Sequence, residues 1–267
     1  MTRRRVRAVG VVGLVGVVGL LLALDDRGAD GQAAGRSVSL AAAVPESDPL
    51  GPPPRLGLTV PHPRLLPARA DGVALWAPVL RSVALRRTPS ASGRVVGRVT
   101  VSTPEQTENI VLVTGATRAR GGLWVPIRAA GAVGWAPRTA LGGYEAVTTR
   151  LLVDTRAFTA TLRRTDGVVF RAPIGVGTSA APTPTGSFFV RNVLTRYRSA
   201  FYGPVAFGTS ARSTLTDWPA GGFVGIHGTN RPDLIPGRIS HGCIRLRNED
   251  ILALARLMPV GTPVEIT

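Results

Sequence analysis

The chain has 267 residues, and 32 basic against 16 acidic side chains give it a formal charge of +16. At roughly 150 residues per domain, this length predicts one large or two small domains with a buried core. Every basic residue is arginine, which excludes the phosphate-binding P-loop, the kinase strand lysine and Schiff-base catalysis. A single cysteine and three histidines exclude a disulfide framework and a four-cysteine zinc site.

Residues 1–24 are expected to form a signal peptide or a membrane anchor. Four arginines within the first seven residues precede an uncharged apolar run over residues 8–24. No good small-x-small cleavage site follows this run, so a cleaved signal and an uncleaved anchor both stay open. Either alternative predicts an extracytoplasmic protein, and an uncleaved segment would tether it to the cytoplasmic membrane.

Residues 25–72 are predicted to be a linker. They are polar at first and then contain eight prolines between residues 45 and 67. Proline at this density favours extended polyproline II, which makes a semi-rigid spacer. His62 lies between two of these prolines, and we expect no role for it.

Short β-like runs separated by turn signals follow over residues 73–145, without any sustained helical period. The expected strands are residues 73–76, 95–101, 110–113, 124–127 and 133–136. Together they predict a small barrel. The order of Leu85-Arg86-Arg87-Thr88-Pro89-Ser90, Gly122-Leu123-Trp124-Val125-Pro126-Ile127 and Gly131-Ala132-Val133-Gly134-Trp135-Ala136 resembles bacterial SH3-like domains, a family that commonly helps enzymes engage the cell wall. A β spacer with Trp124 and Trp135 as core aromatics is the alternative.

Residues 148–267 are also predicted to be mainly β. Strand-like runs are expected at residues 151–153, 157–162, 168–170, 188–190, 223–226 and 264–266. The stretch between Phe188 and Gly222 is expected to be irregular, and it contains Tyr197, Tyr202 and Trp218. One helix is predicted near the C-terminus, with Asn248 as its cap and Pro259 as its stop.

The densest chemical signal is the pair of segments that hold His227, His241 and Cys243. A thiol becomes a good nucleophile only beside a base or in a positive environment, and histidine can accept its proton and return it to a leaving amine. Gly242 allows a tight turn whose main-chain N–H groups can face a developing oxyanion. Two alternatives stay open: an inert buried thiol, and a metal site with His227, His241 and Cys243 as ligands.

These residues resemble a known family. The run Ser240-His241-Gly242-Cys243-Ile244-Arg245, preceded by Ile226-His227-Gly228-Thr229-Asn230, is similar to the signature of the YkuD-type L,D-transpeptidases. The runs Leu152-Val153-Asp154 and Thr183-Pro184-Thr185-Gly186 also resemble that domain. The resemblance implies a β-sandwich-like catalytic domain after the SH3-like barrel, with one short C-terminal helix.

The resemblance also implies a reaction and the residues that perform it. Cys243 would attack a peptidoglycan tetrapeptide stem before its terminal D-alanine and form a thioester, which an amine of a neighbouring stem resolves. His227 would be the base, Gly242 would help to form the oxyanion site and His241 would polarise the pocket. Ser240, Gly228 and Arg245 are the implied substrate-binding residues, and neither a cofactor nor a metal is implied. Many members carry Asn at the position of Arg245, and a salt bridge that fixes the catalytic loop is an equal interpretation of this arginine.

Other functions and partners follow from the same residues. A noncatalytic wall-binding protein and a cysteine L,D-carboxypeptidase that uses water as acceptor are the alternatives. The arginines are dispersed and match no nucleic-acid-binding signature, so nucleic acid is not an expected partner. Anionic wall polymers or a membrane surface suit the positive charge, alongside the peptidoglycan stems.

Overall fold

The structure is a computed structural model that describes residues 72–119, 121–195, 199–213, 218 and 222–267. These residues belong to one compact unit, Leu58–Thr267. The predicted signal or anchor at residues 1–24, and residues 25–71 of the predicted linker, lie outside the described residues. Within the described part of the chain, no helix is long and apolar enough to cross a membrane.

The first sheet is built from residues 74–147. Its strands are β1 (Ala74–Pro78), β2 (Val83–Arg86), β3 (Val95–Val99), β4 (Ile110–Val113), β5 (Thr117–Ala119), β6 (Gly122–Ala129), β7 (Ala132–Pro137) and β8 (Glu145–Val147), with a short 3₁₀ helix, η1 (Arg138–Ala140). They pair antiparallel in the order β3-β2-β7-β6-β4-β1-β8, and β5 pairs with β6. Alternating apolar side chains such as Val111, Val125 and Ile127 form its core.

All five strands predicted in this part of the chain are present. The sequence did not predict β2, β5 and β8, which are short and mostly half-buried or exposed, so their hydrophobic alternation is weak. The SH3-like assignment of residues 73–145 stays a prediction.

The second sheet contains the residues of the predicted catalytic domain. Its strands are β9 (Arg150–Asp154), β10 (Thr159–Arg164), β11 (Gly167–Pro173), β12 (Gly175–Gly177), β13 (Gly186–Leu194), β14 (Ala206–Arg212), β15 (Phe223–His227), β16 (Gly237–Ser240), β17 (Ile244–Arg245) and β18 (Pro263–Ile266). Their order is β11-β10-β9-β18-β13-β14-β15-β17-β12-β16. The sheet is mixed, because β18 pairs parallel with β9, β15 with β17 and β12 with β16.

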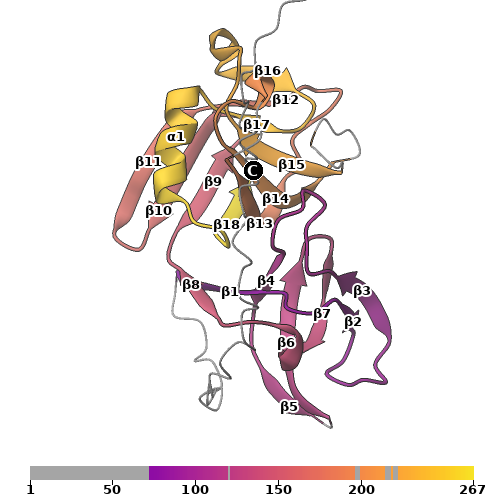
Figure 1. Ribbon diagram of the computed structural model, residues 1–267. Helices are drawn as coiled ribbons and strands as arrows, with labels where there is room; N and C mark the ends of the chain where they lie inside the picture. Colours follow the sequence, from indigo (N-terminus) through magenta and orange to yellow (C-terminus); the bar gives the residue numbers. More distant parts are fainter. Residues whose placement is uncertain (1–71, 120, 196–198, 214–217, 219–221) are drawn as a thin grey trace, which may run out of the picture. The chain divides into compact units, whose positions relative to one another are not determined.

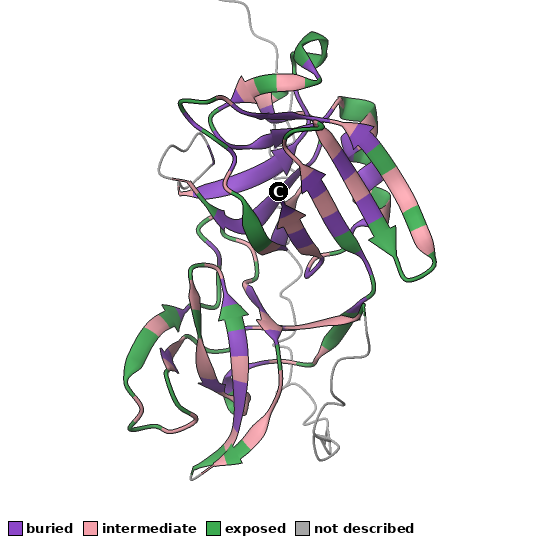
Figure 2. Ribbon diagram, turned by 180° about the vertical axis from the view of Figure 1, so that it is seen from behind, coloured by how far each residue is buried: buried purple, intermediate pink, exposed green. Residues whose placement is uncertain are grey.

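The central strands of this sheet carry the core. β14 and β15 are buried along almost their whole length, and they appear as nearly continuous purple ribbons in Figure 2. Strands buried on both faces lose the apolar–polar alternation that marks a half-exposed strand. The prediction that residues 188–222 are irregular is therefore wrong in part: β13 runs on to Leu194, and β14 follows the short 3₁₀ helix η2 (Ala200–Tyr202).

The C-terminal helix is α1 (Asn248–Leu257), and it packs against β11. Its apolar side chains Ile251 and Leu254 are fully buried in the core of the second sheet. The predicted capping role of Asn248 is wrong. Arg247 occupies the N-cap without a side-chain cap, and the Asn248 side chain instead accepts a hydrogen bond from the Thr229 N–H at 3.0 Å. Another short 3₁₀ helix, η3 (Pro232–Leu234), lies between β15 and β16.

Candidate active site

Cys243 lies in the tight turn that joins β16 to β17. Gly242, just before it, has a φ of 110°, which favours glycine strongly because other residues rarely adopt it. The cysteine is 7% exposed, and the N–H of Gly225 on β15 donates to its Sγ at 3.4 Å. A donor aimed at sulfur favours the thiolate over the thiol.

Two hydroxyl groups fix this turn. The Ser240 hydroxyl donates to the Cys243 carbonyl and accepts from the Gly242 N–H at 3.2 Å. The Thr183 hydroxyl donates to the Gly242 carbonyl at 2.9 Å and accepts from the Gly177 N–H at 2.8 Å. Ser240 thus acts on the backbone beside the thiol, and the Gly242 N–H, which was expected to help to form the oxyanion site, is directed at Ser240.

We predict that replacing Thr183 by valine lowers the free energy of unfolding by about 2 kcal/mol, because two buried backbone groups lose their partner. Thr183→Ser keeps the hydroxyl and serves as the matched control. Urea unfolding of both variants measures the difference. A valine variant as stable as the serine variant would contradict this account of the turn.

His227 ends the neighbouring strand β15 and is fully buried. Its Nδ1 lies 2.6 Å from the carbonyl oxygen of Gly228. A carbonyl oxygen only accepts, so Nδ1 carries the proton and, in the neutral ring, Nε2 carries the lone pair. β15 and β17 run parallel with His227 opposite Arg245, one step beyond the Ile226–Ile244 pair. Cys243, which immediately precedes β17, and His227, which ends β15, are therefore carried by two paired strands.

Aromatic side chains surround this pair of strands. Tyr202 lies edge-on to His227, with ring centroids 4.7 Å apart, and edge-on to Trp218 at 5.9 Å. Tyr202, Trp218 and Cys243 belong to one buried cluster. The sequence did not predict that Tyr202 and Trp218 lie beside the site, because nothing in it distinguished these two from aromatics that only pack.

The other predicted site residues lie in different surroundings. His241 is exposed beside the turn. Arg245 is buried, with its guanidinium carbon 4.4 Å from the centre of the Phe201 ring. Gly228 packs against the backbone of Gly203, where a Cβ would lie 3.1 Å from the Gly203 Cα. Close packing thus already explains the glycine at 228.

Metal ligation by the histidines and the cysteine gains no support from the geometry. Among the residues that the structure describes, no three His, Cys, Asp or Glu side chains are gathered closely enough to hold an ion. The fixed thiol in a glycine turn, with a buried histidine on the adjoining strand, instead defines the class of candidate cysteine-dependent enzymes.

Comparison with known proteins shows what residues 148–266 are similar to. Residues 148–266 match the YkuD family, the L,D-transpeptidase catalytic domain. The chain is 39% identical over 116 residues to the putative L,D-transpeptidase YkuD of Bacillus subtilis, covering 43% of this chain and 64% of that protein. It is 37% identical over 118 residues to the Bacillus licheniformis YkuD, covering 44% of this chain and 65% of the relative. The chain thus spans just under two thirds of these relatives.

A solved structure was also found in the comparison. The catalytic domain of the E. faecium L,D-transpeptidase is 26% identical, with a TM-score of 0.34, and the match covers 45% of this chain and 96% of that one. Residues 148–266 are thus the part of the present chain that is similar to the YkuD family of L,D-transpeptidase catalytic domains.

Proposed function

We propose that the protein is a peptidoglycan L,D-transpeptidase that works through an acyl-enzyme on Cys243. The observation that carries the proposal is the environment of the Cys243 thiol. It belongs to the only cysteine of the chain, it lies in a turn fixed by Ser240 and Thr183, and it accepts an N–H from Gly225. The match of residues 148–266 to the YkuD family model supports peptidoglycan stem peptides as the substrate class.

In the proposed reaction, the Cys243 thiol gives its proton to His227 Nε2, and its sulfur attacks the carbonyl carbon between the third stem residue and the terminal D-alanine. The C–N bond breaks, D-alanine leaves with a proton from His227, and a thioester remains on the sulfur. The amine of a second stem then attacks the thioester carbonyl. A new amide bond forms, the amine loses a proton and the thiol is restored.

His227 is suited to this proton transfer. Its Nδ1–H is directed at the Gly228 carbonyl, which orients the ring and leaves the basic lone pair on Nε2. The surrounding rings of Phe201 and Tyr202 restrict its orientation further. His241, being exposed, is proposed to act at the rim of the site rather than as the principal base.

The location of the protein belongs to the same proposal. A substrate in the cell wall requires export, for which the arginines and apolar run of residues 1–24 provide a signal or an anchor. The excess of arginine would then favour contact with anionic wall polymers or a membrane surface.

Incubation of the full chain with a tetrapeptide stem, followed by mass spectrometry of the intact protein, tests the function. We expect an added mass equal to the tripeptide acyl group, located on Cys243, and equimolar D-alanine release. A cross-linked dimer as product supports transpeptidation, whereas free tripeptide would show a carboxypeptidase. A protein that stays unmodified and releases no D-alanine would overturn the proposal in favour of a noncatalytic wall-binding role.

A further inference from the structure

A buried ion pair links the loop between β3 and β4 to the second sheet. Glu105 in this loop and Arg191 on β13 have side chains only 2% and 1% exposed. The guanidinium binds the carboxylate in a bidentate way, Nη2 to Oε1 at 2.7 Å and Nη1 to Oε2 at 3.2 Å. Burial raises the pKa of Glu105, but the hydrogen bond and charge of Arg191 outweigh it, with help from Trp218, so the net pKa is lowered.

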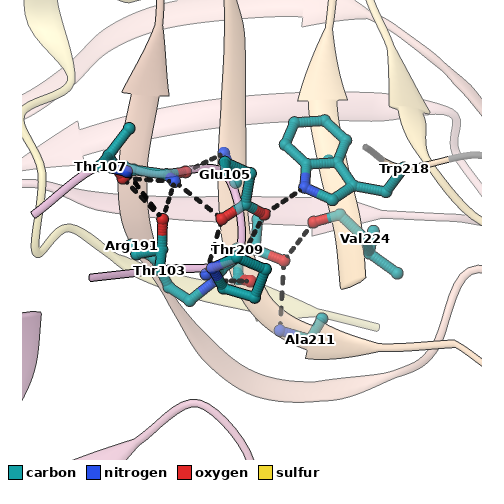
Figure 3. A network of polar contacts seen from close by, with 12 residues as sticks. Thr103, Glu105, Thr107, Arg191, Thr209, Ala211, Trp218 and Val224 are labelled. Carbon is teal, nitrogen blue, oxygen red and sulfur yellow. Dashed lines mark hydrogen bonds and ion pairs between the residues drawn. The ribbon is translucent and has the colours of Figure 1, made fainter. Parts of the chain in front are cut away.

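The loop is held in place by further contacts. The Asn192 amide group donates to the hydroxyls of Thr103 and Thr107, on either side of Glu105, at 3.3 and 2.9 Å. Arg191 also donates through Nε to the Thr209 carbonyl at 2.7 Å. Figure 3 shows the carboxylate of Glu105 between Arg191 and the indole of Trp218. The loop thus presents one fixed carboxylate to the second sheet.

That carboxylate also anchors Trp218. The indole Nε1–H donates to Glu105 Oε1 at 2.6 Å, and the residue is 3% exposed. The ring lies directly on Gly225: a Cβ there would be 1.8 Å from the ring carbon Cζ3. Glycine at 225 therefore leaves the space that the Trp218 ring occupies.

Gly225 and Trp218 in turn contact the thiol site. The Gly225 N–H is the donor to Cys243 Sγ. Trp218 packs edge-on to Tyr202, which packs edge-on to His227. The indole that Glu105 holds is therefore packed against the strand that donates to the sulfur and against the ring that abuts the histidine.

We propose that Glu105 is a positioning residue for the thiol site: by holding the Trp218 indole on Gly225, it fixes the donor to Cys243 and the packing of His227. The residue comes from outside the YkuD-family match at 148–266. The preceding β domain would then complete the catalytic domain through one loop. The effect of Glu105 on catalysis rests on the proposed function. Its effect on the position of the Cys243 sulfur does not.

The test measures the second-order rate at which iodoacetamide alkylates Cys243, the only thiol of the chain, as a function of pH. Trp218→Phe removes the indole N–H together with the five-membered ring, and it keeps an aromatic ring at this position and the Glu105–Arg191 pair. We expect it to lower the rate at neutral pH about fivefold, a coupling typical of residues in contact. Glu105→Ala, which removes the acceptor of the indole N–H, should give a similar loss, and the double variant should react no more slowly than the slower single variant.

Trp124→Phe is the matched control. This tryptophan, on β6, is also buried, and among the described residues its Nε1 has no hydrogen-bond partner. We expect it to react at the wild-type rate. Circular dichroism of each variant establishes that the measured protein is folded.

Two results would overturn the inference: folded Trp218→Phe reacting at the wild-type rate and pH profile, or losses in the two single variants that add fully in the double variant. A different result would show that the proposed function is wrong: wild-type Cys243 would form no acyl adduct with the stem peptide. Alkylation rates would still report whether Glu105 positions the sulfur.

Discussion

Cys243→Ala is expected to abolish both D-alanine release and acyl-adduct formation. The chain has no second thiol to take over the attack, and no other nucleophile is placed on the Gly225 donor. Cys243→Ser keeps a hydroxyl in the same turn, but it should also lose most activity because a hydroxyl is far less acidic than a thiol. Full activity in the alanine variant would refute the assignment of the nucleophile.

The same assay of D-alanine release tests the role of His227 through the variant His227→Gln. We expect a loss of about 10²–10⁴-fold in kcat, the usual contribution of a positioned general base. Asp233→Asn is the control, since Asp233 forms an exposed ion pair with Arg231 and should leave the rate unchanged. D-alanine release and the yield of cross-linked dimer measure all four variants.

The sequence predicted the parts of the fold whose signals are local. Strands such as β4 and β9 show apolar runs bounded by turns, and α1 has the helical period with Pro259 after it. β12, β16 and β17 escaped prediction because they are two to four residues long and two of them contain glycine. Their pairing depends on partners far away in the sequence, as for Gly175 with Gly237.

The residues of the candidate site also divide into those with a local signal in the sequence and those that depend on long-range contacts. Cys243, Ser240 and His227 lie within seventeen residues, so spacing and resemblance were enough to identify them together. Thr183 reaches Gly242 across 59 positions, and Glu105 reaches Arg191 across 86. No periodicity encodes such contacts. Arginine and glutamate side chains are normally exposed to solvent, so the burial of this pair could be recognised only from the structure.

Removal of one partner of the buried Glu105–Arg191 pair should destabilise the fold strongly. We expect Glu105→Ala to lower the free energy of unfolding by about 3–5 kcal/mol, because it leaves the Arg191 guanidinium buried without its counter-charge. Arg191→Met should cost a similar amount for the converse reason. The double variant Glu105→Ala/Arg191→Met removes both charges and should lose clearly less than the sum of the single losses. Urea unfolding of the four proteins gives the coupling, and fully additive losses would contradict it.

The same pair should respond to acid in a defined direction. The pKa of Glu105 is lower in the folded protein than its ordinary value near 4.5, so the folded state binds the proton less readily than the unfolded chain. Its stabilising contribution is complete above the unfolded pKa and disappears as the pH falls through the folded one. The stability difference between wild type and Glu105→Ala should therefore be largest near neutrality and shrink in acid. A difference that stayed constant across that range would mean that packing of the Glu105 stem, rather than its charge, holds the loop against β13.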